Sequence, residues 1–199
     1  MEPLKISYND RTLFHMLRHF ESINDTARTC LLDRGYKPGQ IVTELMMLGS
    51  KFHVSFANDI KSLEKQLLNG IMKHSFTKNG YIHQCFEFDI NLFPNGVGKL
   101  GMASIQDLKD KGFTSFEWKH NRGLELCHYF LNVMPSTNTL TVVLKPQKKY
   151  QLLITAFPGK VALPLPKKGM TDAFFQKCQQ FWQEHAFLEM DDKDKRITS

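Results

Sequence analysis

The chain has 199 residues, of which 42% are hydrophobic and sixteen are Phe, and this composition favours a folded globular protein over a disordered one. No apolar run approaches the roughly 20 residues that a membrane-spanning helix needs, and the stretch MEPLKISYND has no apolar segment typical of a secretory signal. A cytoplasmic protein without a membrane span is therefore expected. The formal net charge is +6, which suits an anionic partner.

Positive charge gathers in the second half of the chain. Between residues 91 and 170, eleven Lys and Arg accompany four Asp and Glu, a net charge of +7, whereas the remainder nets −1. A basic surface on a soluble domain most often meets nucleic acid, so nucleic acid is the expected anionic partner. A surface whose lysines only maintain solubility is the alternative.

The four cysteines are spread singly along the chain and form no CxxC pair. This spacing does not favour a zinc ribbon or a disulfide framework. Reduced and mostly buried thiols are expected at all four positions, which are Cys30, Cys85, Cys127 and Cys178.

Two helices are expected in the first third of the chain. The first covers residues 10–20, with Asn9 or Asp10 as its cap. The second covers residues 57–74, with Asn58 as its cap. Apolar residues recur in this second segment at helical spacing, namely Ile60, Leu63, Leu67 and Ile71.

Strands are expected from residue 81 onward. Alternating, aromatic and β-branched sequences indicate strands over 81–90, 124–134, 138–145 and 150–157, the last two joined by the short hairpin PQKK. A loop with several prolines then leads to a last helix. Thr171 is expected to cap that helix, and one of its faces carries Phe174, Cys178 and Phe181.

This order of elements predicts an α+β fold, with N-terminal helices packed on a twisted antiparallel sheet and a C-terminal helix. One domain is expected over residues 1–199. Its parts are a mainly helical segment, a sheet segment, a loop with the C-terminal helix, and a frayed charged tail, over 1–78, 79–158, 159–190 and 191–199.

Two histidines in the stretch RTLFHMLRHF suggest acid–base chemistry. His15 and His19 are four residues apart and share one helix face, which Arg11 and Arg18 can border. RNA cleavage needs one group that removes the proton of the ribose 2′-OH, another that protonates the leaving 5′-oxygen, and a cation that stabilises the phosphorane. Arg28 follows not far downstream. A solvated polar face and a metal site remain alternatives, although the Glu of H-E-x-x-H is missing.

The last two strands supply a second set of polar residues. Lys145, Lys148 and Lys149 lie at their hairpin tip, and a polar turn with Thr139 precedes them. Alternation places Leu153, Thr155 and Phe157 on one face. There the Thr155 hydroxyl can contact a phosphate, or the residue can simply favour a strand, and Phe157 is a core residue or a base-stacking platform.

Three other features are weaker. The stretch NGVGKLG lacks the GK[ST] of a P-loop and is predicted to be a turn. The stretch WKHNRG, which includes Arg122, is predicted to be a loop that either contacts RNA or is an ordinary polar loop. His53, His74 and His185 have no identifiable partners in the sequence.

The helix with FHMLRHF and the strand ending LLITAFPG resemble the bacterial ribonuclease toxins of the barnase–EndoU–colicin–RelE group, most closely the ribonuclease-like toxin domains of contact-dependent inhibition systems. The resemblance covers the two ends of the expected catalytic sheet, not the middle of the chain or the C-terminal extension. It implies helices packed on an antiparallel sheet and RNA cleavage without a metal.

Position by position, the resemblance assigns the family's histidine to His15 or His19, and its arginine to Arg28 or Arg18. Thr155 matches its threonine. Phe157 stands where the family has tyrosine, so that hydroxyl is absent or is supplied elsewhere, with Tyr150 as a candidate.

The sequence thus predicts a metal-independent endoribonuclease of toxin type that forms a 2′,3′-cyclic phosphate and needs no cofactor. RNA, with tRNA as one candidate, and an antitoxin or immunity protein are the expected partners. A non-enzymatic basic module that binds RNA or protein is the main alternative, and a zinc-dependent hydrolase that uses the histidine pair is a third. The predicted catalytic residues are His15, His19, Arg18, Arg28 and Thr155, and the predicted substrate-binding residues are Lys145, Lys148, Tyr150, Thr139, Phe157 and Arg122.

Overall fold

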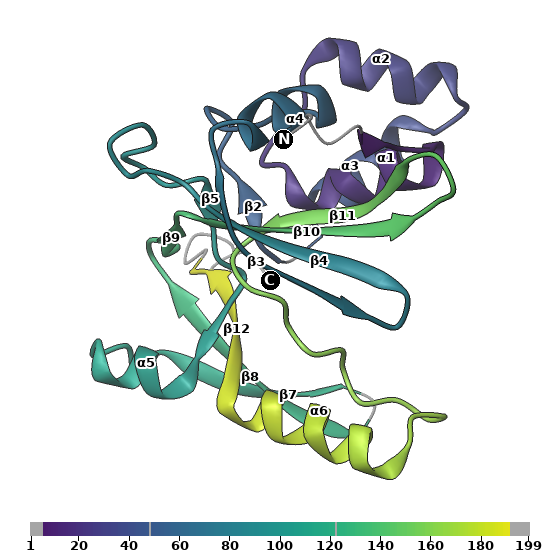
Figure 1. Cartoon of the computed structure of the whole chain (residues 1–199). Coiled ribbons are helices and arrows are strands. Elements are labelled where there is room, and N and C mark those ends of the chain that lie inside the picture. Colours follow the sequence, from purple (N-terminus) through teal and green to yellow (C-terminus); the bar gives the residue numbers. More distant parts are fainter. Residues whose placement is uncertain (1–5, 48, 122, 192–199) are drawn as a thin grey trace. The chain divides into compact units, whose positions relative to one another are not determined.

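A computed structural model describes residues 6–47, 49–121 and 123–191. The protein is α+β, as predicted (Figure 1). Its contacts divide it into two compact units. Unit 1 comprises the chain up to Lys99 together with Ser136–Lys160, and unit 2 comprises Leu100–Pro135 together with the chain from Val161. Two compact units can belong to one domain, so the single domain expected over 1–199 stays a prediction.

The helices of unit 1 begin at polar caps. The Asn9 side chain accepts a hydrogen bond from the backbone N–H of Thr12 at 2.9 Å, which confirms the expected start of the first helix. That helix tightens into a 3₁₀ turn at its end. The helical elements of unit 1 are α1 (Asp10–Met16), η1 (Leu17–His19), α2 (Asp25–Asp33), α3 (Pro38–Leu45) and α4 (Ile60–Leu67).

The helix expected over 57–74 was wrong at both ends. Asp59, not Asn58, caps α4 and accepts a hydrogen bond from the N–H of Ser62 at 2.6 Å. The helix stops at Leu67, and Gly70 passes so close to Phe88 that a Cβ there would lie 2.8 Å from the ring. The chain then enters β3 (Ile71–Lys78), so the segment 1–78 is not purely helical. Pairing with the following strand outweighs the local helical pattern.

The main sheet of unit 1 has five strands in the order β1-β11-β10-β4-β3 (Figure 1). All neighbours are antiparallel except β1 and β11, which are parallel. The strands expected over 81–90, 138–145 and 150–157 are present. Besides β3, the sheet contains β1 (Ile6–Ser7), β4 (Tyr81–Glu87), β10 (Thr139–Pro146) and β11 (Gln151–Pro158).

The core of unit 1 lies between the N-terminal helices and one face of this sheet. Met16 and Phe20 from the first helical segment and Leu63 from α4 are buried in it. Burial of such a side chain contributes about 1.5–3 kcal/mol, so the helices are held mainly by this packing. The sheet contributes Leu140, Val142, Leu144, Leu153 and Ala156.

A β-bulge in β11 changes the predicted face of Leu153, whereas Thr155 and Phe157 share a face as predicted, because their partners Val143 and Thr141 are two residues apart on β10. Thr155 pairs with Val143, whereas Leu153 pairs with the next residue of β10, Leu144, and the register shifts between them. Neighbouring residues of a strand point to opposite faces. Leu153 therefore faces the helices, and Thr155 lies on the other face. The extra residue is Ile154, and simple alternation could not anticipate it.

A short second sheet of unit 1 joins β2 (Lys51–Phe52), β5 (Gly98–Lys99) and β9 (Ser136–Thr137) in the order β2-β5-β9. Part of the glycine-rich stretch predicted to be a turn is thus a strand. A Cβ on Gly98 would lie 2.3 Å from the Lys51 carbonyl oxygen. Only glycine allows these strands to approach so closely.

Unit 2 is built on a four-stranded sheet in the order β6-β12-β8-β7. Its core includes Leu108, Cys127, Tyr129 and Leu188. Two of its strands correct the predictions. Residues of the WKHNRG stretch belong to β7 and not to a loop, and the C-terminal helix is followed by β12, which runs parallel to β8. The elements are β6 (Met102–Ser104), α5 (Ile105–Asp110), β7 (Phe116–Asn121), β8 (Leu124–Leu131), α6 (Asp172–Glu184) and β12 (His185–Met190).

The start of α6 and the cysteines agree with the sequence. Thr171 is the N-cap of α6, although its side chain makes no capping hydrogen bond. The four cysteines are free thiols; three are buried and Cys30 is half-buried. Apart from residue 191, the tail expected over 191–199 lies outside the described residues.

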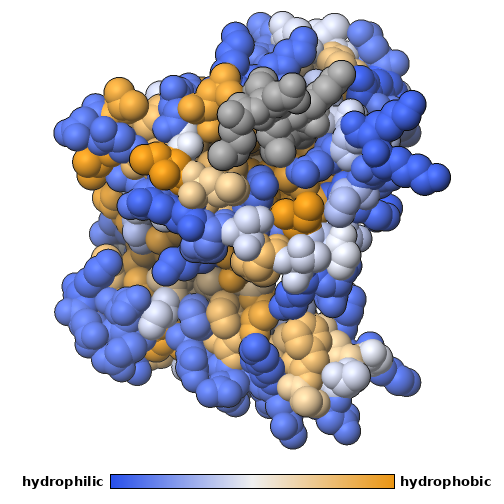
Figure 2. Space-filling view, in the orientation of Figure 1, coloured by the Kyte–Doolittle hydropathy of each residue, from blue (hydrophilic) through white to orange (hydrophobic). Residues whose placement is uncertain are grey.

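Apolar side chains also reach the surface, as Figure 2 shows for one face of the molecule. Among the most exposed are Met46, Leu68 and Val133. In the described parts of the chain, no helix has both the length and the apolar character needed to cross a membrane.

Candidate functional site

The end of the first helical segment brings three predicted site residues together. The rings of His15 and His19 are 5.8 Å apart between centroids and nearly perpendicular. The ring of His19 lies 5.7 Å from that of Phe157 on β11. In the part of the chain that the structure describes, β1 pairs with Gln151 and Leu152 of β11 and does not extend to Phe157.

His19 is held as a neutral imidazole. Its Nδ1 lies 3.1 Å from the Ser50 carbonyl oxygen, which can only accept, so Nδ1 carries the hydrogen and Nε2 the lone pair. Burial lowers the pKa of His19 to about 3, and the Ser50 hydrogen bond opposes this only in part. His19 therefore joins the helix to the chain just before β2 and does not exchange protons near pH 7.

His15 is better placed to act as a base. It is only partly buried, and its pKa is lowered by burial and then by the charge of Arg18. The imidazole is therefore neutral at pH 7 and has a lone pair available for a proton. A group in this state fits general-base catalysis near neutral pH.

Two cations stand beside the histidines. The Arg18 guanidinium donates to Glu44 of α3 through Nε, at 2.8 Å, and through Nη2. Lys51 donates from Nζ to the Leu45 carbonyl oxygen at 2.6 Å. Burial, and then Arg18, lower the pKa of Lys51 to about 8. The sequence analysis missed Glu44 and Lys51, because both are far along the chain from the helix and carry no motif of their own.

Arg18 is the electrostatic centre of this group. Its charge lowers the pKa of His15, His19 and Lys51 alike. Two neutral imidazoles, the Lys51 ammonium and the Arg18–Glu44 ion pair together carry one net positive charge, which favours an incoming anion. We call His15, Arg18, His19, Lys51 and Phe157 the Arg18 cluster.

Two other predicted catalytic residues are not brought into the Arg18 cluster. Arg28 is exposed on α2, and no contact found among the described residues joins it to either histidine. Thr155 shares its sheet face with Phe157, but no contact found among the described residues joins Thr155 to either histidine. Its Oγ1 is buried and has no hydrogen-bond partner in the described part of the chain.

The predicted substrate-binding residues lie along the β10–β11 hairpin. Thr139, at one end, shares a hydrogen bond of 2.9 Å with the hydroxyl of Thr137. Lys145, Lys148 and Tyr150 are exposed at or near the tip. Lys145 lies four positions along β10 from Thr141, the partner of Phe157, and this spacing corresponds to about 13 Å along a strand. The tip can therefore contact only a remote part of a ligand held at the Arg18 cluster. Arg122 lies outside the described residues.

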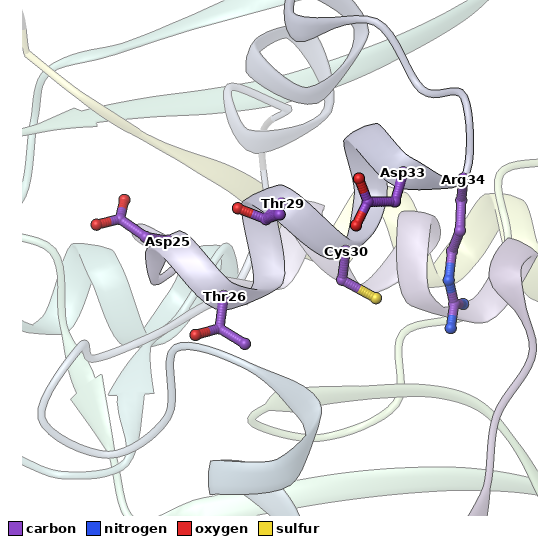
Figure 3. Close-up of a pocket in the computed structure, with 6 residues that line it drawn as sticks. All are labelled: Asp25, Thr26, Thr29, Cys30, Asp33 and Arg34. Atoms are coloured by element: carbon purple, nitrogen blue, oxygen red, sulfur yellow. The ribbon is translucent and has the colours of Figure 1, made fainter.

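A separate hollow of about 520 Å³ lies along α2 and is shown in Figure 3. None of the predicted site residues that the structure describes lines it. Arg34, at one end, is paired with Asp10. Its lining residues are Asp25, Thr26, Thr29, Cys30, Asp33 and Arg34.

Within residues 6–47, 49–121 and 123–191, no group of three or more His, Cys, Asp or Glu is arranged to hold a metal ion. Comparison of the chain with protein-family models, curated proteins and solved structures found no match.

Proposed function

We propose that the protein is a metal-independent endoribonuclease of toxin type that acts on RNA inside the cell. The observation that carries the proposal is the Arg18 cluster, in which a partly buried neutral imidazole, two cations and an aromatic ring meet at one helix end. The resemblance of the flanking sequences to ribonuclease toxins supports the same reaction.

The cluster supplies each function that RNA cleavage needs. His15 removes the proton of the ribose 2′-OH, whose oxygen then attacks phosphorus. The ammonium of Lys51, with a pKa of about 8, protonates the 5′-oxygen as its bond to phosphorus breaks, which leaves a 2′,3′-cyclic phosphate. Arg18 stabilises the charge of the phosphorane, and Phe157 stacks on a base. His19 positions the segment that carries Lys51.

The expected partners follow from charge. The net +7 between residues 91 and 170 attracts RNA, with tRNA as one candidate, and an acidic antitoxin or immunity protein would be the matching inhibitor. Each phosphate contact contributes a log–log salt slope of about −0.7 on single strands. Replacement of Lys145, Lys148 and Lys149 together should flatten the slope measured by RNA binding at several salt concentrations.

The decisive test is RNA cleavage in EDTA by purified variants whose folding is checked by thermal melting. Loss of general acid–base catalysis costs about 10²–10⁴-fold, so His15→Gln and Lys51→Met should each lose cleavage on that scale. His74→Gln, which alters an exposed histidine of β3, is the control and should cleave normally. Full cleavage by both site variants would show that the active site lies elsewhere.

A binding module without catalysis is the second candidate, favoured by β3. This edge strand exposes nearly all of its residues, including Ile71, Met72 and Phe76. Exposed sheet edges can accept a partner strand. RNA or protein binding by the wild-type protein, with no cleavage in the same assay, would favour this function over the nuclease.

A further inference from the structure

Three residues outside the Arg18 cluster form a chain of polar contacts in unit 1. The Oγ of Ser136 on β9 lies 3.2 Å from Nε2 of His53. On the other side of the same ring, Nδ1 lies 3.7 Å from Oε1 of Glu21. The order hydroxyl, imidazole, carboxylate is that of a nucleophile, its base and the group that orients the base.

The backbone accounts for this arrangement. Phe20 and Phe52 form a parallel bridge and are both buried, so the residues that follow them, Glu21 and His53, come side by side on the outer face. The register of the short sheet brings the serine to the same place, because Lys99 pairs with Lys51 on one side and with Ser136 on the other. Residues 21, 53 and 136 thus converge from three segments.

The contacts of Glu21 keep its carboxylate ionised and in place to orient the imidazole of His53. Lys99 lies 2.5 Å from its Oε1, and Oε2 accepts the N–H of Val54 at 3.3 Å. Burial alone would raise the pKa of Glu21, but Lys99, Val54 and His53 together lower it below its usual value. The carboxylate is therefore ionised at pH 7. It favours a hydrogen on Nδ1 of His53 and leaves the lone pair of Nε2 directed at the serine hydroxyl.

We propose that Ser136, His53 and Glu21 form a second reactive centre, at which Ser136 attacks the carbonyl carbon of small activated esters. The Oγ–carbon bond forms as the Oγ proton passes to Nε2 of His53. The ester C–O bond then breaks, and the leaving alcohol takes that proton. Water, activated by the same imidazole, releases the acid and restores the hydroxyl.

The surroundings favour small ester substrates. The hydrogen bond between Ser136 and His53 is exposed, so the serine is open to a ligand from solution. Lys99 lies directly opposite Ser136 in the short sheet, and its ammonium is paired with Glu21, so it holds the carboxylate that orients His53. Val54, next to His53, is 53% exposed and offers an apolar contact for a short acyl chain.

The first experiment is labelling of the full chain by diisopropyl fluorophosphate. This probe transfers its phosphoryl group to an activated serine with loss of fluoride. Intact mass spectrometry should show one addition, peptide mapping should place it on Ser136, and Ser136→Ala should abolish it. Ser75→Ala, at an exposed serine of β3, is the matched control and should label normally. Absence of labelling, or labelling that survives Ser136→Ala, would overturn the proposal.

The second experiment tests the role of His53 by release of p-nitrophenol from p-nitrophenyl acetate. His53→Gln should slow the reaction by about 10²-fold or more, since general-base catalysis is worth that much. Glu21→Gln should lower kcat with little change in KM, because the carboxylate orients the imidazole and does not contact the ester. Equal rates in wild type and His53→Gln would refute the assignment. RNA cleavage by Ser136→Ala should be unchanged, because no residue is shared with the Arg18 cluster.

Discussion

The sequence and the structure imply different roles for the side chain of Thr155. The resemblance implies that its hydroxyl contacts a phosphate, whereas the structure buries that hydroxyl on the sheet face opposite the core residues Leu153 and Ala156. The buried Oγ1 has no partner in the described part of the chain, and a buried unsatisfied polar group costs about 1–3 kcal/mol. Valine has the same shape without the hydroxyl. Thr155→Val should therefore raise the free energy of unfolding by about 1 kcal/mol or more, or the melting temperature by roughly 2–4 °C per kcal/mol in a chain of this size.

Thr141 provides a matched control on the neighbouring strand. It is buried, and its Oγ1 donates to the Gly159 carbonyl oxygen at 2.7 Å. Thr141→Val leaves that carbonyl without its donor, so it should lower the free energy of unfolding by about 1–3 kcal/mol. The same substitution thus has opposite signs at two adjacent strands, and urea denaturation of both variants measures the difference.

RNA cleavage by the same variants completes the test. With Thr155 outside the Arg18 cluster, Thr155→Val should cleave RNA as wild type does. A loss on the order of 10²–10³-fold, the value of one transition-state donor, together with unchanged or lower stability, would show that the hydroxyl serves the substrate. The argument from burial would then be refuted.

Three further predictions concern pH and packing. The lowered pKa of Lys51, about 8, means that the unfolded chain binds more protons between about pH 8 and 10.4, so stability rises with pH there; denaturant titrations should show that Lys51→Met removes this rise. For His19, with a pKa of about 3, stability should fall as pH drops from about 6.5 towards 3, and His19→Asn should weaken that fall. Gly98→Ala places a Cβ 2.3 Å from the Lys51 carbonyl and should cost about 1–3 kcal/mol in thermal melts, whereas Gly39→Ala, with open space in α3, should be neutral or stabilising; equal effects would contradict the packing argument.

Features that depend on a few neighbouring residues could be predicted from the sequence. The cap of α1 at Asn9 depends on a hydrogen bond to a residue three positions away. The main strands are indicated by the alternation of apolar and polar residues. The end of α4 and the bulge at Ile154 could not be predicted in this way, because each is decided by a partner strand. The helical spacing around Ile71 is real in the sequence, yet pairing of this residue with Glu87 determines the structure.

The residues of the candidate site also differ in whether the sequence could predict them. The sequence located His15, Arg18, His19 and Phe157, because two motifs carry them. It missed Lys51, which completes the cluster, since a lone lysine beside a short strand has no signature. His53 had no identifiable partner because its neighbours come from distant segments. Contacts of this kind are tertiary, and a single sequence does not encode them in any spacing.

The division of the contacts into two units carries no local signal in the sequence for a related reason. The chain leaves unit 1 after Lys99 and returns at Ser136, and these two residues pair directly in the short sheet. Inserted segments are tolerated where their two ends lie close together, and the pairing of Lys99 with Ser136 brings the two ends of the segment 100–135 together. Nothing in composition marks that pairing. The same pairing of β5 with β9 places Ser136 opposite Lys99 and within hydrogen-bonding distance of His53. The proposed second centre therefore depends on the register of this pairing.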